Sequence, residues 1–141
     1  MPDVDTMRAL VGRRTAWQDL VVEPEQARRF CQAIGLDGGP YGDGPSRRFD
    51  RQLAAPTFLA VVRTMDPALE LPQLGPAVNG GNSYRWLRPV YVGERLRRRT
   101  ELVEVTAREG RSGPMTFVTT ETTVERDDEV VAVGRGTSIF R

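Results

Sequence analysis

The stretch MTFVTTETTV, residues 115–124, decides the fold, because most of its side chains are β-branched and favour an extended strand. Asp127-Asp128 follows it as a hairpin signal, and a further strand segment, Val130–Ile139, comes next. On the other side, Arg108–Pro114 is rich in turn formers and separates it from Leu96–Thr106, which alternates apolar and polar residues. These segments predict an antiparallel meander.

Upstream of the meander, Ser83–Arg88 alternates and ends at Pro89, which adds a strand and gives three to four in the second half. Arg13–Val22 is a weaker lead-in strand. The expected architecture is α+β, with helices first and then an antiparallel sheet of about five strands wrapped round a buried helix.

Two helices are expected before the meander. Residues 24–35 have proline at the first helical position, an acid in the first turn, apolar residues at helical spacing and Gly35 as a stop. Pro56–Met65 is apolar on nearly all sides, which indicates a buried central helix. Residues 36–53 between them form a long glycine- and proline-rich loop, and loops of that length are often functional.

Composition excludes several classes of chemistry. The 141 residues, 39% hydrophobic and 28% charged, fit one globular domain over residues 1–141. The net charge of +1 gives no general attraction to nucleic acid or membrane surfaces. The chain has no histidine, and all of its 20 basic residues are arginine. Catalytic triads with histidine, lysine Schiff bases and most zinc sites are therefore excluded within this chain, and we expect no metal.

The single cysteine, Cys31, cannot form an internal disulfide, which favours a reducing compartment. The first residues lack an apolar leader, and no run is long enough to span a bilayer. We expect a cytoplasmic protein that binds neither nucleic acid nor membrane.

The order of these elements resembles the hot-dog fold, and several stretches resemble the MaoC-like family of (R)-specific enoyl-thioester hydratases and 3-hydroxyacyl-thioester dehydratases. Within it, the sequence looks most like the FAS1-like dehydratase branch. The stretches that carry the resemblance are Phe30–Gly35 with Pro40-Tyr41, Ala54–Phe58, Asn79–Pro89 with Val92–Leu96, and Gly110–Val118. The resemblance implies a single hot-dog domain acting on an acyl thioester of coenzyme A or acyl carrier protein, without another cofactor.

The family's catalytic signature, Gly-Asp-x-Asn-Pro-x-His, is degenerate in this chain. Counting from Gly35, the aspartate position holds Leu36, the asparagine position holds Gly38, and the histidine position holds Tyr41. Asp37 stands one place late. The family also offers a backbone N–H at the start of its central helix to polarise the thioester carbonyl, but Pro56 has none to donate.

The resemblance therefore implies a non-catalytic subunit that shapes the acyl pocket of a heteromeric hydratase or dehydratase. Its partner would be a MaoC-like hot-dog subunit with the catalytic pair, joined through the sheet edges. Two alternatives stay open. One is a self-sufficient homodimer with unusual chemistry, such as a lyase, isomerase or thioesterase. The other is a non-enzymatic module that binds acyl thioesters.

Candidate site residues follow from the same stretches. Weak catalytic candidates are Asp37 and Tyr41. The simpler interpretation of Asp37 is a local backbone hydrogen bond in the Gly-Gly turn, and that of Tyr41 is a loop tyrosine that covers the end of the helix. Expected substrate contacts are Tyr41, Pro56, Thr57, Asn79, Gly81 and Asn82. Three arginines on one face of a strand are candidates for the phosphates of coenzyme A or a carrier arm, namely Arg95, Arg97 and Arg99. The simpler interpretation of these arginines is a solvated edge strand that resists aggregation.

Overall fold

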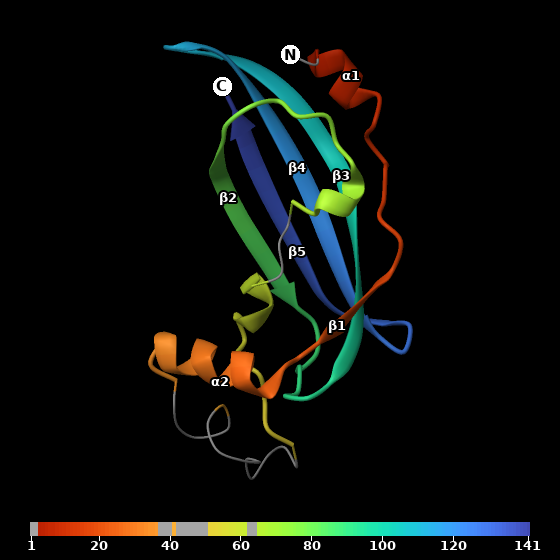
Figure 1. Ribbon diagram of the computed structural model, residues 1–141, viewed down its shortest axis with the longest axis vertical. Helices are drawn as coiled ribbons and strands as arrows, with labels where there is room; N and C mark the ends of the chain where they lie inside the picture. Colours follow the sequence, from red (N-terminus) through yellow and green to blue (C-terminus); the bar gives the residue numbers. More distant parts are fainter. Residues whose placement is uncertain (1–2, 37–40, 42–50, 62–64) are drawn as a thin grey trace.

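The computed structural model describes residues 3–36, 41, 51–61 and 65–141. In this part of the chain, five strands form one antiparallel sheet in the order β1-β3-β4-β5-β2 (Figure 1). The strands are β1 (Gln18–Val21), β2 (Ala77–Trp86), β3 (Arg95–Gly110), β4 (Gly113–Arg126) and β5 (Glu129–Phe140). The expected α+β architecture with about five strands is confirmed.

The helix expected over residues 24–35 is α2 (Pro24–Ala33). Its C-terminus closes as a Schellman motif, in which the Leu36 N–H donates to the Cys31 carbonyl at 2.8 Å and the Gly35 N–H donates to the Gln32 carbonyl at 3.3 Å. Gly35 has φ +75°, a conformation that glycine adopts without strain. A short helix that the sequence did not predict, α1 (Val4–Arg8), precedes β1 and buries Met7.

The central segment differs from the helix expected over Pro56–Met65. Its described part contains a 3₁₀ helix, η2 (Phe58–Val61), and residues 62–64 lie outside the described residues. Hydrogen bonds run from Phe58 N–H to the Ala55 carbonyl and from Ala60 N–H to the Thr57 carbonyl, a three-residue spacing that winds the tighter helix. A second 3₁₀ helix, η3 (Pro67–Leu69), follows, with Asp66 accepting from the Ala68 N–H at its start.

The boundaries of the strands also differ from those expected from the sequence. β2 begins at Ala77, six residues before the expected start, because pairing with β5 extends the strand through the unfavourable Asn79–Asn82 stretch. The β3–β4 hairpin turns at residues 111–112, so most of the expected turn over 108–114 is strand. The hairpin signal Asp127-Asp128 is confirmed. Both residues have positive φ, 44° and 69°, as a two-residue type I′ turn requires.

β3 lies between β1 and β4, so the interpretation of its arginines as an edge strand was wrong. Within the sheet, the edges are β1 and β2. β2 is exposed along nearly its whole length, and β5 is its one neighbour among the described strands.

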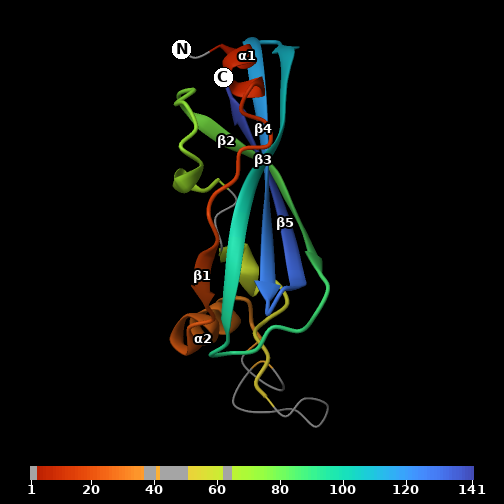
Figure 2. The same ribbon diagram turned by 90° about the vertical axis from the view of Figure 1, so that its right-hand side faces the viewer.

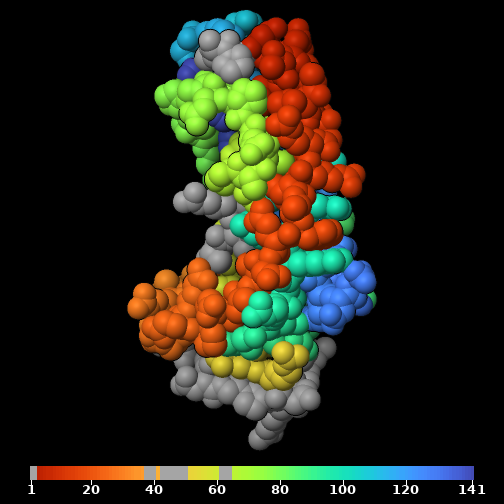
Figure 3. All heavy atoms as spheres, turned by 45° about the vertical axis from the view of Figure 1, so that its right-hand side comes forward, coloured from red at the N-terminus to blue at the C-terminus, as the bar shows by residue number. Residues whose placement is uncertain are grey.

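The inner face of the sheet carries two apolar clusters. One, near α2 and η2, includes Phe58, Leu59 and Val124, and the other, near α1 and η3, includes Met7, Leu74 and Val118. Figure 2 shows α2 and η2 at one end of the sheet and α1 at the other, and Figure 3 shows the N-terminal residues running along the molecule between them.

A polar belt lies in the sheet between the two clusters. The hydroxyls of Thr100 and Thr122 are 2.8 Å apart, and the buried Asp66 carboxylate accepts from Gln18 at 3.2 Å and lies 3.8 Å from Arg98. Nη1 of Arg98 is buried without a hydrogen-bond partner among the described residues. The inner face is therefore divided into two apolar compartments.

Candidate functional site

A cavity of about 420 Å³, here called cavity A, opens between the central segment and the end of β2. The buried strip Leu53–Ala55 forms one wall, and the Trp86–Val90 segment forms the other. Hydrogen bonding joins the walls, because the Ala54 N–H donates to the Val90 carbonyl at 2.8 Å and Leu53 forms a bridge with Tyr91. The cavity is thus held by backbone pairing and lined mostly by apolar groups.

Two of the expected substrate residues, Tyr41 and Pro56, line cavity A. Tyr41 is half-buried and packs against the cluster that contains Phe58. Phe58 is 1% exposed and meets Phe30 edge to face at 5.8 Å between ring centroids. The long loop therefore contributes at least one side chain, that of Tyr41, to the cavity.

The chemistry of cavity A is restricted. Its described lining holds no carboxylate, and the chain has no histidine at any position. Its polar side chains are Tyr41 and Arg88. Asp37, the other weak catalytic candidate, lies outside the described residues. The described wall can enclose an apolar group, but it offers no acid–base pair of the kind that exchanges a proton near neutral pH.

The other expected substrate contacts do not line cavity A. Thr57 is exposed beside it. Asn79, Gly81 and Asn82 are exposed on the edge strand β2, where Asn79 Oδ1 accepts from the Gly81 N–H at 2.8 Å beside a β-bulge. The hydrogen bond of Asn79 is thus local, and the predicted substrate contacts at these three positions stay predictions.

The arginines expected to contact phosphate lie along β3, two residues apart. Arg95 is 3.5 Å from Asp19, and Arg97 is 2.7 Å from Glu125 and also pairs with Asp128. The hydrogen bond with Glu125 raises the pKa of Arg97, and it outweighs the desolvation of the guanidinium, which acts to lower that pKa. Arg97 and Arg99 both stack on Trp17, with distances of 4.4 and 4.5 Å to the ring centroid. The three guanidinium groups therefore have partners within the chain.

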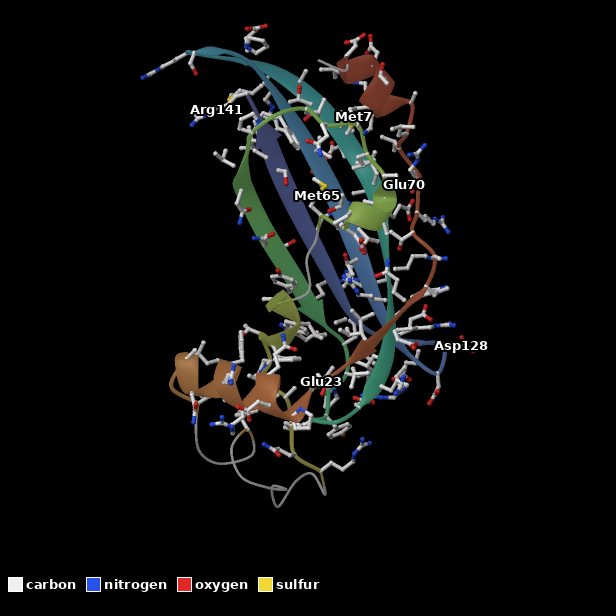
Figure 4. All side chains as sticks on the ribbon, viewed as in Figure 1. Met7, Glu23, Met65, Glu70, Asp128 and Arg141 are labelled. Carbon is white, nitrogen blue, oxygen red and sulfur yellow. The ribbon has the colours of Figure 1, made fainter. Side chains whose placement is uncertain are left out.

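Charge at this surface does not favour an anion. The hollow of about 340 Å³ beside Arg95 and Arg97 is lined by four carboxylates, from Asp19, Glu125 and the turn Asp127-Asp128. Asp128, labelled in Figure 4, lies at this turn on the side away from α2. The described carboxylates outnumber the arginines here, which disfavours an incoming phosphate.

Sequence reasoning missed the group that holds the second wall of cavity A. Glu94 is buried, accepts from the Tyr91 N–H at 3.1 Å, and is clamped by Arg126, which donates to it through Nε and through Nη2 at 2.9 Å. Burial raises the pKa of Glu94, but the hydrogen bonds from Arg126 and Tyr91 outweigh it and leave the pKa lowered. Arg126 also donates to the Pro89 carbonyl at 2.7 Å. The clamp therefore fixes the turn that borders the cavity.

A second cavity of about 500 Å³, here called cavity B, lies at the other apolar compartment. Met7, Met65 and Glu70, labelled in Figure 4, belong to its lining, together with Val118 and Phe140 of the sheet. The buried Asp66 carboxylate faces it from the polar belt. Ala77, the first residue of β2, lines cavity B, and Trp86, the last residue of β2, lines cavity A. The two cavities therefore lie beside opposite ends of β2.

Within residues 3–36, 41, 51–61 and 65–141, no cluster of acidic or cysteine side chains is placed to hold a metal ion. Over the same residues, no helix has the length and apolar character needed to cross a membrane.

Comparison with known proteins identifies the fold. The family model of the FAS1-like dehydratase domain region matches residues 9–133. The HadBC complex, a 3R-hydroxyacyl-ACP dehydratase from Mycobacterium tuberculosis, is similar with a TM-score of 0.73 and 22% identity, over 92% of this chain and 96% of that chain. The ChsH1-ChsH2 complex from the same organism is similar with a TM-score of 0.75 and 17% identity, over 96% and 87%.

A MaoC-like dehydratase from Rhodospirillum rubrum is also similar, with a TM-score of 0.68 and 22% identity over 92% of this chain and 91% of that chain. No curated protein matches the sequence. The expected resemblance to MaoC-like proteins with a hot-dog fold is confirmed.

Proposed function

Because the chain belongs to the FAS1-like dehydratase family, we propose that it is the non-catalytic subunit of a heteromeric hydratase or dehydratase that acts on acyl thioesters. It shapes the acyl pocket, while a second hot-dog subunit supplies the groups that move protons. The reaction of the complex is the addition of water to an enoyl thioester, or its reverse.

The observation that carries this proposal is an apolar cavity whose described lining holds no base. Addition of water across the α,β bond needs one group to take a proton from water and another to give one to the α-carbon. The resemblance places an aspartate and a histidine in these roles, but the matching positions here are Leu36 and Tyr41. Cavity A nevertheless keeps a volume of about 420 Å³ and a largely apolar wall. Binding and chemistry are thus separable between two chains.

The edge strand β2 is the surface that we assign to the partner. It is exposed and ten residues long, and among the described strands it pairs only with β5, so its outer edge offers backbone donors and acceptors to another strand. Both cavities border β2, at Ala77 and at Trp86. A hot-dog subunit that extends the sheet at this edge brings its own side chains close to the cavities. The similar HadBC and ChsH1-ChsH2 structures are complexes, which supports a partner of this kind.

The test is an assay of the hydration of crotonyl-CoA and of a longer trans-2-enoyl-CoA, in which the reaction is measured as the loss of the enoyl absorbance. The purified chain is assayed alone, and then mixed with a MaoC-like hot-dog subunit that keeps the signature aspartate and histidine and is encoded beside it. We expect activity in the mixture and none in this chain alone, together with co-elution of the two chains from a sizing column.

The matched control is the partner subunit by itself. If the partner alone is as active as the mixture, the chain does not shape the pocket. Activity of this chain alone would instead support the self-sufficient homodimer, and stoichiometric thioester binding without turnover in any mixture would support the binding module.

A further inference from the structure

We propose that Arg88 is the phosphate-recognition residue for the carrier arm of the thioester; this inference rests on the proposed function and deepens it. An acyl thioester of coenzyme A or of acyl carrier protein carries at least one phosphate group at the far end of its pantetheine arm. If the acyl group enters cavity A, that phosphate stays outside, near the rim of the cavity. A cation at the rim is therefore the group to identify.

Arg88 is the cationic side chain in the described lining of cavity A, and the described linings of cavity B and of the small hollow beside Leu59 contain none. It is more than half exposed, as a group at a rim must be. Its neighbour Leu87 is an exposed apolar side chain in the same lining, so the rim offers a cation beside an apolar surface. A pantetheine phosphate has the complementary character, since an anion is attached to a partly apolar arm.

The backbone at Arg88 is fixed before any ligand arrives. The N–H groups of Leu87 and Arg88 both donate to the Val131 carbonyl, at 2.9 and 3.2 Å. Nη1 of Arg88 donates to the Leu87 carbonyl at 2.8 Å, which holds the guanidinium over its own segment. A donor that is held in place loses less side-chain entropy when it binds an anion.

The counterion of Arg88 can be exchanged. Its Nε is 3.1 Å from Glu129, and the two side chains are 58% and 54% exposed. Ion pairs of this kind contribute little in water because solvent screens both partners. A phosphate makes stronger charge-assisted bonds with a guanidinium and can displace such a carboxylate.

The arginines that the sequence suggested are in a different situation. Arg97 has two carboxylate partners, and four carboxylates line the hollow beside Arg95 and Arg97. An anion at that surface would have to displace existing pairs against a local excess of negative charge. Among the described residues, Arg88 pairs with one carboxylate, that of Glu129, and it borders the cavity that the acyl group would occupy.

The experiment compares three ligands by calorimetry: crotonyl-CoA, crotonyl-phosphopantetheine and crotonyl-pantetheine, which has no phosphate. The full chain is used, alone or assembled with its partner subunit, whichever preparation binds crotonyl-CoA. We expect the wild type to bind both phosphorylated ligands at least about tenfold more tightly than it binds crotonyl-pantetheine. Arg88→Gln should remove most of this preference and leave the affinity for crotonyl-pantetheine within about twofold.

Two further variants sharpen the comparison. Arg95→Gln, which removes an exposed charge on β3 (72% exposed, against 58% for Arg88), should keep the full preference. Arg88→Lys should keep part of it because the charge remains. Circular dichroism confirms that each variant is folded. If Arg88→Gln keeps the preference, or Arg95→Gln loses it, the assignment is wrong although the proposed function stands. If no preparation binds any of the three thioesters, the proposed function fails and the assignment fails with it.

Discussion

Substitution of Glu94 by glutamine tests whether the clamp beside cavity A is as important as its geometry implies. The change keeps the shape of the side chain and removes its charge. Glu94 is 8% exposed and holds Arg126 through both carboxylate oxygens, with the Tyr91 N–H as a third donor. Removing one partner of a buried ion pair typically lowers stability by about 3–5 kcal/mol.

Two features reduce that figure here. The Arg126 side chain is 24% exposed, so water can solvate part of the abandoned guanidinium, and glutamine can still accept from the Tyr91 N–H. We therefore expect Glu94→Gln to lower the free energy of unfolding by about 2 kcal/mol, which corresponds to a fall in Tm of about 7 °C for a chain of this size. Urea and thermal unfolding measured by circular dichroism give both quantities.

The effect should depend on pH in a defined direction. The folded-state pKa of Glu94 lies below the ordinary value of 4.5, so its ionised form is stabilised by folding. This contribution is complete above the unfolded pKa and is lost as the pH falls through the folded pKa. The difference between wild type and Glu94→Gln should therefore be full at pH 7 and should shrink below about pH 4.

The control is Glu25→Gln on α2. Glu25 also pairs with two arginines, Arg28 and Arg29, and the hydrogen bond from Arg28 is the main cause that lowers its pKa to about 2. Its carboxylate is exposed, and we expect a much smaller loss than at Glu94. The reasoning is refuted if Glu94→Gln is no more destabilising than Glu25→Gln at pH 7, or if its effect does not diminish in acid.

Two further predictions concern α2 and cavity A. Gly35→Ala should lower the free energy of unfolding by about 1 kcal/mol in urea titrations, because a side chain is strained at the φ of +75° that Gly35 adopts. An added Cβ has no described atom within 4 Å, so the loss comes from the backbone and not from a clash. An unchanged urea midpoint would show that α2 ends without needing this conformation. Leu59→Trp should fill part of cavity A, since Leu59 is buried in its wall, and should weaken binding of a long trans-2-enoyl-CoA at least tenfold while crotonyl-CoA changes less than threefold. Equal losses for both ligands in calorimetry would mean that the acyl group does not reach Leu59.

The sheet was predictable because its signals are local. The threonine- and valine-rich run over 115–124 has a strong strand preference, and Asp127-Asp128 supplies the two positive-φ residues of a hairpin turn. The end of α2 at Gly35 was predictable for the same reason. The predicted start of β2, at Ser83, was six residues too far along the chain, because the residues of Asn79–Asn82 have low strand propensity. The pairing of β2 with β5 extends the strand through these residues.

The site was less predictable because it is built by contacts between distant segments. The pairing of Leu53 and Ala54 with Val90 and Tyr91, which forms both walls of cavity A, involves too few residues to leave a periodic pattern. The Arg126–Glu94 clamp joins residues 32 positions apart. Tyr41 and Pro56, which the family resemblance suggested as substrate contacts, both line cavity A, and their contact with a substrate stays a prediction. The arginines of β3 were chosen by charge alone, which cannot reveal carboxylates on neighbouring strands.

The most direct test of the division of labour between two subunits is the turnover of crotonyl-CoA by the assembled complex with one subunit altered at a time. One complex carries Tyr41→Phe in this chain, which removes the hydroxyl in cavity A that is the remaining acid–base candidate among its described lining residues. The other carries an alanine in place of the partner's signature histidine. We predict that Tyr41→Phe leaves kcat within about threefold, whereas loss of the partner's histidine lowers it by about 10² or more. A large fall in kcat with Tyr41→Phe, or activity that survives loss of the histidine, would contradict the account.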